Sequence, residues 1–298
     1  MFTGCLAALV TPFRDGAVDF AALDGLVDHV LAGGVSGLVP CGTTGESPTL
    51  GDDERNAVIA AVARRVRGRV PVIAGTGTNS TARSVEHSRA AVAAGADGVM
   101  LVAPYYNRPS QGGLYEHFSA VAREVSAPII LYNIPGRTGV EISVETIARL
   151  RADHRHIVAV KHATGSLDGA SELAAACDIA ILSGDDSLTL PLISVGAVGV
   201  ISVLANLLPA EMSAFTAAAV SGDLRTAQKW HRKLFPLARG LLKLDTNPIP
   251  IKTALALRGM MAEEFRLPLC PLGMDGRRRL TALLSPAAGS PGAAGVTP

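Results

Sequence analysis

The sequence predicts an α/β fold of the (β/α)8 type, also called a TIM barrel, followed by a C-terminal helical extension. Short apolar segments alternate with longer amphipathic segments along most of the chain. A glycine-containing turn also recurs where a helical segment gives way to an apolar one. A doubly wound open sheet is the alternative, but "GTGTNS" at 75–80 lacks the third glycine of the dinucleotide-binding fingerprint.

Eight apolar segments have the length and residue types of buried strands. We expect these strands at 4–10, 37–41, 71–75, 98–103, 128–133, 157–161, 179–183 and 198–203. Amphipathic segments at 19–33, 52–67 and 80–94 are typical of the intervening helices. In the recurring turn, one glycine can take the left-handed helix cap and a second opens the strand, as in Gly34/Gly37, Gly95/Gly98 and Gly196/Gly199.

The pattern divides the chain into three parts. Residues 1–206 are expected to form the barrel, which carries the catalytic site. Residues 207–284 have a helical pattern with expected breaks at Pro209, Pro236 and Pro248, and should pack on the barrel. Residues 285–298 are rich in Gly, Pro and Ala, a composition that predicts a disordered tail.

Composition excludes several classes of partner. The chain of 298 residues has a formal net charge of +1, which gives no reason to expect nucleic acid or a membrane surface as a partner. The four cysteines are scattered without C-x-x-C spacing, as in a reduced cytosolic enzyme. The first residues lack a basic segment, so no signal peptide is expected, and no apolar run is long enough to span a bilayer. A cytoplasmic location follows as the expectation.

Lys161 ends the apolar run Ile157–Val160 and raises the first question about function. Taken alone, a lysine at a strand end is most simply a solvated side chain. Other polar or small residues, however, follow the neighbouring predicted strands, and in a barrel the carboxyl ends of all strands meet at one rim. These residues are Thr43, Thr44, Tyr105, Tyr106, Asn107, Tyr132, Arg137, Gly184 and Asp185. Their joint placement favours a functional role for Lys161.

The histidines do not form a metal-binding pattern. His154 and His156 precede the sixth strand, at the end of the barrel opposite the expected site. His29, His87, His117 and His231 lie in helical segments without an H-x-x-x-H companion. No metal and no other cofactor is therefore expected, and the lysine itself has to supply the electrophilic chemistry.

Partial dehydration at the inner rim favours the neutral amine of Lys161, which can attack a ketone. The resulting iminium is an electron sink for making an enamine at the neighbouring carbon. Tyr132 is suited to shuttle protons beside the lysine, and Thr43 and Tyr106 could carry them onward. The Thr43–Thr44 turn offers donors for a carboxylate, and Arg137 could bind a second one. The residue types therefore indicate a Schiff-base lyase or aldolase that acts on a 2-oxo acid.

Four motifs, in order and spacing, resemble the 4-hydroxy-tetrahydrodipicolinate synthase family. They are "GTTGE" (42–46), "PYYNRPS" (104–110), "YNIPGRTG" (132–139) and "KHATG" (161–165), and the similarity continues to "NPIPIK" (247–252). The resemblance implies a homotetrameric enzyme that condenses pyruvate with L-aspartate 4-semialdehyde in the diaminopimelate route to lysine.

The resemblance also implies a role for each matching residue. Lys161 would form the pyruvate imine, Tyr132 would be the acid and base beside it, and Thr43 would link Tyr132 to Tyr106 of a neighbouring subunit. Thr44 would bind the pyruvate carboxylate, with the main chain near Ile201 close by, and Arg137 would bind the aldehyde carboxylate. Gly184 is also expected among the substrate-binding residues.

Two positions depart from the family pattern. His162 stands where a glutamate commonly follows the lysine, and this substitution could alter the surroundings of Lys161 or mark a paralogue. Arg83 stands where lysine-inhibited members of the family commonly have an acidic residue that binds the lysine ammonium. Ser47, Asn79 and Tyr105 match other positions of the same pocket. Two cations repel, so lysine is expected to inhibit weakly or not at all. The alternatives are another pyruvate-dependent aldolase, whose substrate would not need Arg137, and a non-catalytic barrel that binds a 2-oxo acid.

Overall fold

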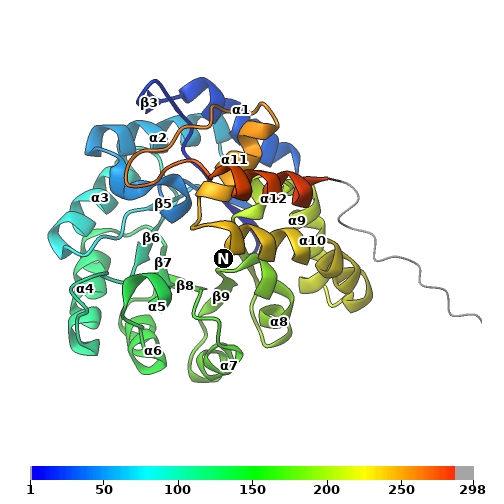
Figure 1. Ribbon diagram of the computed structural model, residues 1–298. Helices are drawn as coiled ribbons and strands as arrows, with labels where there is room; N and C mark the ends of the chain where they lie inside the picture. Colours follow the sequence, from blue (N-terminus) through cyan, green and yellow to red (C-terminus); the bar gives the residue numbers. More distant parts are fainter. Residues whose placement is uncertain (1, 286–298) are drawn as a thin grey trace, which may run out of the picture.

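The computed structural model describes residues 2–285 and has the predicted barrel fold. Eight parallel strands form one sheet in the order β4-β1-β10-β9-β8-β7-β6-β5. The two end strands, β4 and β5, are joined by a parallel bridge between Leu38 and Val72 and by a hydrogen bond of 2.9 Å from Gly75 N to Pro40 O. Helices surround the strands (Figure 1). The fold class is therefore confirmed, and the open doubly wound sheet is wrong.

All eight predicted strands are present, each within a few residues of its predicted bounds. They are β1 (Gly4–Ala8), β4 (Gly37–Val39), β5 (Ile73–Gly75), β6 (Gly98–Val102), β7 (Ile129–Asn133), β8 (Ile157–His162), β9 (Ala180–Ser183) and β10 (Gly199–Ser202). The sequence analysis missed a short hairpin of β2 (Phe13–Arg14) and β3 (Ala17–Val18). Its signal was Asp15–Gly16, which both take positive φ, as a tight hairpin turn requires.

The helices also follow the predicted pattern. They are α1 (Phe20–Ala32), α2 (Asp52–Val66), α3 (Thr81–Ala93), α4 (Gln111–Glu124), α5 (Pro135–Thr138), α6 (Val144–Asp153), α7 (Leu167–Ala176), α8 (Thr189–Ser194), α9 (Pro209–Val220), α10 (Leu224–Leu244), α11 (Ile249–Leu257) and α12 (Met274–Leu284). Short 3-10 turns are η1 (Thr43–Gly45), η2 (Ser47–Thr49), η3 (Asp186–Leu188) and η4 (Leu204–Asn206).

Local sequence explains where many helices begin and where the strands follow. A side-chain oxygen at the N-cap accepts a hydrogen bond from the first turn in α1, α3, α4, α6, α7 and α10. Gly34, Gly95 and Gly196 take φ of +76°, +99° and +110°, which a residue with a side chain rarely adopts. Gly199 then opens β10 because a Cβ there would lie 2.2 Å from Gly4 O. The recurring turn is thus confirmed.

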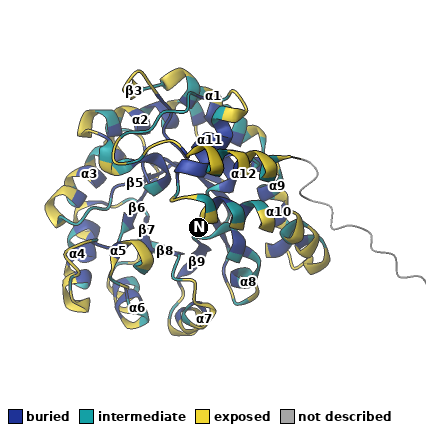
Figure 2. Cartoon of the chain, viewed as in Figure 1, coloured by how far each residue is buried: buried dark blue, intermediate teal, exposed yellow. Residues whose placement is uncertain are grey.

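The strands divide the core into two layers. Side chains on one face fill the barrel interior, among them Leu6, Met100, Ile130 and Ile201. Side chains on the other face pack under the helices in a larger cluster. Figure 2 shows the strands buried and the outer faces of the helices exposed. Because successive side chains of a strand point to opposite faces, this layering decides which residues reach the site.

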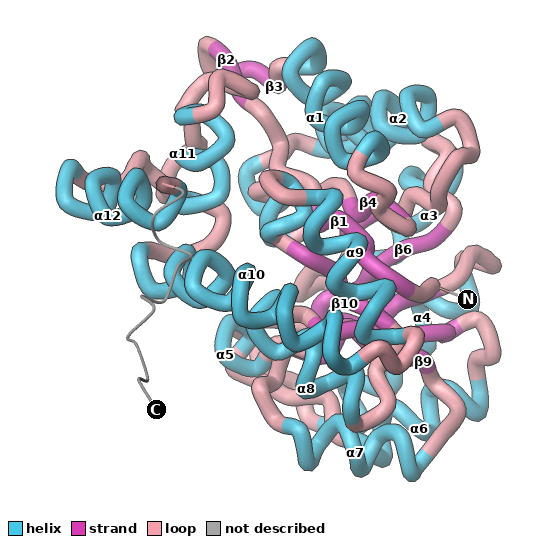
Figure 3. The backbone as a smooth tube through the Cα atoms, turned by 90° about the vertical axis from the view of Figure 1, so that its right-hand side faces the viewer, coloured by secondary structure: helices cyan, strands magenta, loops and turns pink. Residues whose placement is uncertain are grey.

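The C-terminal region packs on the barrel. Helix α9 begins at Pro209 and contacts α1, α8 and β1, so it lies in the ring of helices. Helices α10, α11 and α12 lie beyond the end of the barrel opposite the chain's N-terminus (Figure 3). Because β1 starts beside that terminus, this is the carboxyl end of the strands. The division at residue 206 stays a prediction, and the predicted tail, apart from Ser285, lies outside the described residues.

One expected helix break is wrong. Pro236 lies inside α10, which runs without interruption from Leu224 to Leu244. A proline there costs a backbone hydrogen bond, but the buried Leu234, Ala238 and Leu241 pack this helix against the rest of the molecule. Tertiary packing therefore overrides the local signal. Pro209 and Pro248 stand at helix starts as expected.

Candidate active site

Lys161 and Tyr132 lie side by side inside the barrel. They are register partners on β8 and β7, and both side chains are almost fully buried. The Lys161 Nζ lies 4.1 Å from the centre of the Tyr132 ring. Lys161 shares its strand face with Ala159, which belongs to the interior layer. Its position at the end of an apolar run thus places a buried amine at the rim, next to a phenol.

His162 points the other way. It shares its strand face with Val160, in the layer under the helices. Its Nε2 lies 2.9 Å from Ser166 O and 2.9 Å from Thr164 Oγ1. The side chain therefore holds the loop that leads into α7 and does not contact the amine of Lys161. The suggestion that His162 alters the immediate surroundings of the lysine finds no support in this geometry.

Thr43 and Thr44 form the first part of η1, directly after β4. The turn is tightly held: the Gly45 carbonyl accepts a hydrogen bond of 2.8 Å from Thr11 Oγ1. Thr43 and Tyr132 line the same small cavity of about 30 Å³, together with Gly75 and Met100. Thr43 and Tyr132 thus face one small cavity between β4 and β7.

Arg137 and Thr44 share a partner. The Thr44 Oγ1 accepts a hydrogen bond of 3.0 Å from Asn247 Nδ2. The Arg137 Nη2 donates to Asn247 O at 3.1 Å and to Thr246 Oγ1 at 3.4 Å. Arg137 also lines a cavity of about 190 Å³ with Thr43, Ser47 and Tyr105. Both predicted carboxylate-binding residues are therefore fixed by the loop that precedes α11.

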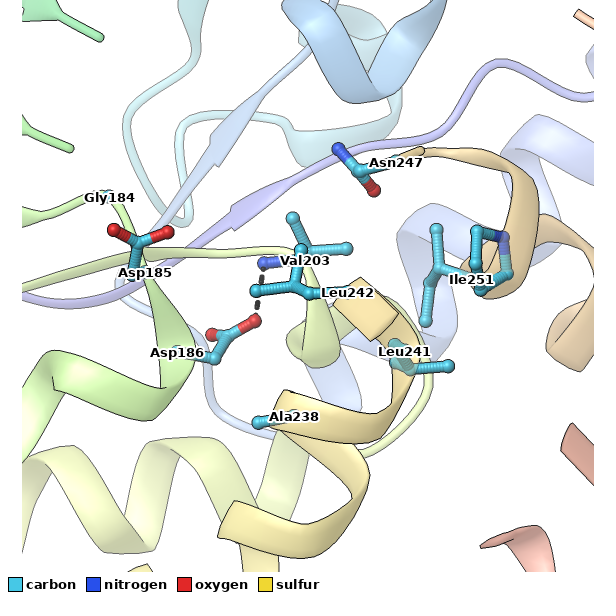
Figure 4. Close-up of a pocket in the computed structure, with 10 residues that line it drawn as sticks. Gly184, Asp185, Asp186, Val203, Ala238, Leu241, Leu242, Asn247 and Ile251 are labelled. Atoms are coloured by element: carbon cyan, nitrogen blue, oxygen red, sulfur yellow. Dashed lines mark hydrogen bonds between the residues drawn. The ribbon is translucent and has the colours of Figure 1, made fainter. Parts of the chain in front are cut away.

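Gly184 and Ile201 lie where β9 and β10 end. Ile201 is fully buried in the interior layer with Tyr132 and Leu182. Gly184 packs against Ala163, and a Cβ at this position would lie 2.5 Å from the Ala163 side chain. Figure 4 shows Gly184 next to Asp185, with Asn247 nearby in the lining of the same pocket. A glycine is required here because the ends of β8 and β9 approach so closely.

Two adjacent carboxyl groups follow Gly184. Burial raises the pKa of Asp185, although electrostatic interactions with Lys161, His162 and Arg239 oppose the shift. Burial also raises the pKa of Asp186, whose Oδ2 accepts hydrogen bonds from Val203 N at 3.1 Å and Leu204 N at 2.9 Å (Figure 4). Asp186 therefore ties the end of β9 to the end of β10.

Tyr106 is not brought to the site of its own chain. Its side chain is 90% exposed, and its backbone takes a φ of +73°. Its only hydrogen bond among the described residues joins its backbone N to Thr138 O, at 3.4 Å. A bulky residue held in this conformation and left in solvent is available to a second molecule.

Sequence reasoning missed three residues around the site. Asn247 and Lys252 belong to "NPIPIK", a motif that carried the resemblance but received no role, and Asp186 is the second acid of "GDD". Within residues 2–285 no cluster of three or more His, Cys, Asp or Glu side chains could hold a metal ion. Over the same range, no helix is both long and apolar enough to cross a membrane.

Comparison with known proteins gives a consistent result. The sequence model of the Dihydrodipicolinate synthetase family matches residues 1–287. The 4-hydroxy-tetrahydrodipicolinate synthase of Pelobacter propionicus is 53% identical over 286 residues, which cover 95% of this chain and 98% of that protein. The enzyme of the same name from Sorangium cellulosum is 55% identical, with 93% of each chain covered. The crystal structure of dihydrodipicolinate synthase from Aquifex aeolicus superposes with a TM-score of 0.93 at 47% identity, over 95% of this chain and 97% of that one.

Proposed function

This chain belongs to the dihydrodipicolinate synthetase family, and we propose that it acts as a 4-hydroxy-tetrahydrodipicolinate synthase through a pyruvate imine on Lys161. The activity, that of a lyase in lysine and diaminopimelate biosynthesis, is the one that its full-length relatives carry in their names. The observation that supports the residue assignment is the buried Lys161 amine, 4.1 Å from the ring of Tyr132 at the carboxyl rim of the barrel.

The proposed reaction starts at Lys161. Its neutral amine attacks the C2 carbonyl of pyruvate, and loss of water gives an iminium. Removal of a C3 proton then gives an enamine, with Tyr132 as the acid and base and Thr43 as the next member of the relay. The enamine carbon attacks the aldehyde of L-aspartate 4-semialdehyde. The amino group of that substrate finally displaces Lys161 as the ring closes. The iminium is the electron sink, so the proposal includes no cofactor.

The two substrate carboxylates have separate proposed partners. The Thr44 hydroxyl and the backbone N–H groups of its turn would bind the pyruvate carboxylate, with the main chain at Gly184 and Ile201 closing the other side. Arg137 would bind the aldehyde carboxylate, because a guanidinium pairs with a carboxylate through two parallel hydrogen bonds. This arrangement favours the synthase over an aldolase whose substrate carries hydroxyl groups at that end.

Incubation with pyruvate and borohydride tests the imine. The parent chain should gain one reduced pyruvate adduct, located on the peptide that carries Lys161, and the Lys161→Ala variant should gain none. Turnover with L-aspartate 4-semialdehyde then tests the acceptor. A folded parent chain that forms no adduct would contradict the proposal. The hypothesis of a non-catalytic barrel would then be favoured.

We further propose a homotetramer in which Tyr106 completes the site of a neighbouring copy. The support is the Tyr106 side chain, which is left exposed by residues 2–285. A co-expressed pair of variants, Tyr106→Phe and Lys161→Ala, should regain activity, because one site per pair would contain both intact residues. No recovery in a mixed oligomer would show that Tyr106 does not complete the site of a neighbouring copy. A cytoplasmic location is part of this proposal, since the four cysteines are all free thiols, as in a reducing compartment.

A further inference from the structure

A completely buried ion pair joins the C-terminal extension to the turn that carries Thr43 and Thr44. The Lys252 Nζ of α11 lies 2.5 Å from Glu46 Oε1, and neither side chain has exposed surface. The rings of Phe13 and Phe265 lie 4.4 Å and 4.9 Å from the same ammonium. Lys252 and Glu46 are thus buried together beside two aromatic rings.

Such a buried ion pair contributes little to folding stability. Moving two charges out of water costs free energy that their attraction only partly returns, and an apolar pair of the same volume is often as stable. Burial lowers the pKa of Lys252 against the attraction of Glu46, which shows that the interior opposes the charge. A buried pair of this kind is better explained by the geometry that it imposes on its neighbours.

Glu46 is the residue whose backbone is constrained. It takes a φ of +53° at the junction between η1 and η2, in the left-handed region that disfavours a side chain. Its second carboxylate oxygen accepts a hydrogen bond of 3.2 Å from Arg266 N. Both oxygens of Glu46 are therefore bound to the extension, and its conformation depends on that contact.

The same segment of the extension reaches the turn a second time. Asn247 stands five positions before Lys252 in "NPIPIK" and donates to Thr44 Oγ1 at 3.0 Å. Because the Thr44 oxygen already accepts this bond, its own hydrogen is left to donate to a ligand. The segment thus holds the turn on both sides, at Thr44 and at Glu46.

We propose that the segment 247–252 positions the turn that binds the pyruvate carboxylate. Lys252 fixes the backbone of Glu46 and with it the N–H groups of the turn, while Asn247 orients the Thr44 hydroxyl toward the carboxylate. Asn247 and Lys252 are positioning residues and do not touch the reacting atoms. This inference rests on the proposed function, because it requires pyruvate to bind at the Thr43–Thr44 turn.

Steady-state kinetics of four variants test the assignment. Asn247→Ala should raise the KM for pyruvate about tenfold, the usual effect of losing one hydrogen bond near a charged ligand. Asn247→Asp should raise it further, because a carboxylate accepts the Thr44 proton and repels the substrate. Lys252→Met leaves Glu46 unpaired and should weaken both folding and pyruvate binding. Glu46→Gln/Lys252→Met, a neutral pair of similar volume, should regain the parent Tm but not the parent KM for pyruvate.

A matched control separates positioning from general destabilisation. Leu280→Ala creates a cavity in α12, at a fully buried side chain outside the segment. It should lower Tm while the KM for pyruvate stays at the parent value. The inference is overturned if Asn247→Ala and the neutral pair both keep the parent KM for pyruvate.

Failure of the proposed function gives a different result, since the parent chain itself would then form no borohydride-trapped adduct at Lys161. If Lys252→Met does not fold, the Asn247 variants and the neutral pair still decide the question.

Discussion

Replacing Arg137 by alanine should separate the two substrates of the enzyme. The guanidinium lies on the short helix α5 after β7, where Nη2 donates to Asn247 O at 3.1 Å. This contact uses one nitrogen and leaves the others free to bind a carboxylate. The Arg137→Ala variant should therefore lose binding of the aldehyde substrate, while Lys161 and Thr44 still bind pyruvate.

The size of the effect follows from the contacts. A hydrogen bond to a charged group contributes about 1.5–3 kcal/mol, and Arg137 is exposed, so solvent screens part of its charge. We therefore expect a loss of about 2–3 kcal/mol, which corresponds to a change of about 30- to 150-fold in kcat/KM for L-aspartate 4-semialdehyde. The KM for pyruvate should change by less than about threefold. Arg137→Lys should recover only part of the loss, because an ammonium cannot pair through two parallel bonds.

The assay measures initial rates with each substrate varied at a saturating level of the other, together with borohydride trapping of pyruvate. Trapping should be unchanged in Arg137→Ala. An equal rise in both KM values would refute the reasoning and assign Arg137 to the structure of the rim. An unchanged kcat/KM for the aldehyde would instead favour an aldolase that uses a different acceptor.

Three further predictions concern titration and regulation. Burial lowers the pKa of the His117 imidazole to about 4, below its value in the unfolded chain. The stability that neutral His117 contributes is therefore complete above about pH 6.5, and it should fall by about 3 kcal/mol as the pH drops from the unfolded pKa to the folded one. Urea midpoints of His117→Asn should depend less on pH than those of the parent, and an equal slope would exclude His117 as the cause. Lysine should inhibit weakly, because the cation Arg55 lines the cavity that Ser47 and Tyr105 share, and Arg83 stands where the family resemblance places an acidic residue. The Asp52 carboxylate, whose oxygens lie 2.9 Å from Arg83 Nη2, reduces this repulsion. Arg83→Glu should strengthen inhibition about 30-fold, as expected for reversing one charge near the ammonium, and half-inhibition of the parent at sub-millimolar lysine would disprove the repulsion. The raised pKa of Asp186 means that the free energy of unfolding falls as the pH rises through that pKa. The Asp186→Asn variant keeps an acceptor for the two backbone N–H groups, so it should raise Tm at neutral pH by about 2–4 °C per kcal/mol gained. A lower Tm would show that the carboxylate charge is required.

The alternation of segments and the strand-end motifs were sufficient to predict the barrel and most of the residues that meet at its carboxyl rim. Periodicity alone gives strands and helices in order, whereas the pairing of Lys161 with Tyr132 on the inner face comes from the register of β8 against β7. The glycines at the helix ends follow from backbone sterics, which act between neighbours in the chain. These features are local, so a single sequence carries them.

Contacts between distant segments could not be predicted in the same way. Glu46 and Lys252 are separated by 206 positions, and the sequence around neither residue indicates that the other is its partner. The direction of His162 also depended on the register of β8 against its neighbours, since a shift of one residue exchanges the two faces. Pro236 ended no helix because packing of α10 outweighed its local cost.

The sequence by itself therefore determined the fold class and identified Lys161, with the residue types around it, as the candidate site. Only the tertiary structure decided which residues hold that set in place: Asn247 at Thr44 and Arg137, Lys252 at Glu46, and Asp186 between β9 and β10. The physical reason is that backbone preferences and hydrophobic periodicity act within a few residues, whereas the desolvation of a buried charge is compensated only by whichever group the fold brings to it.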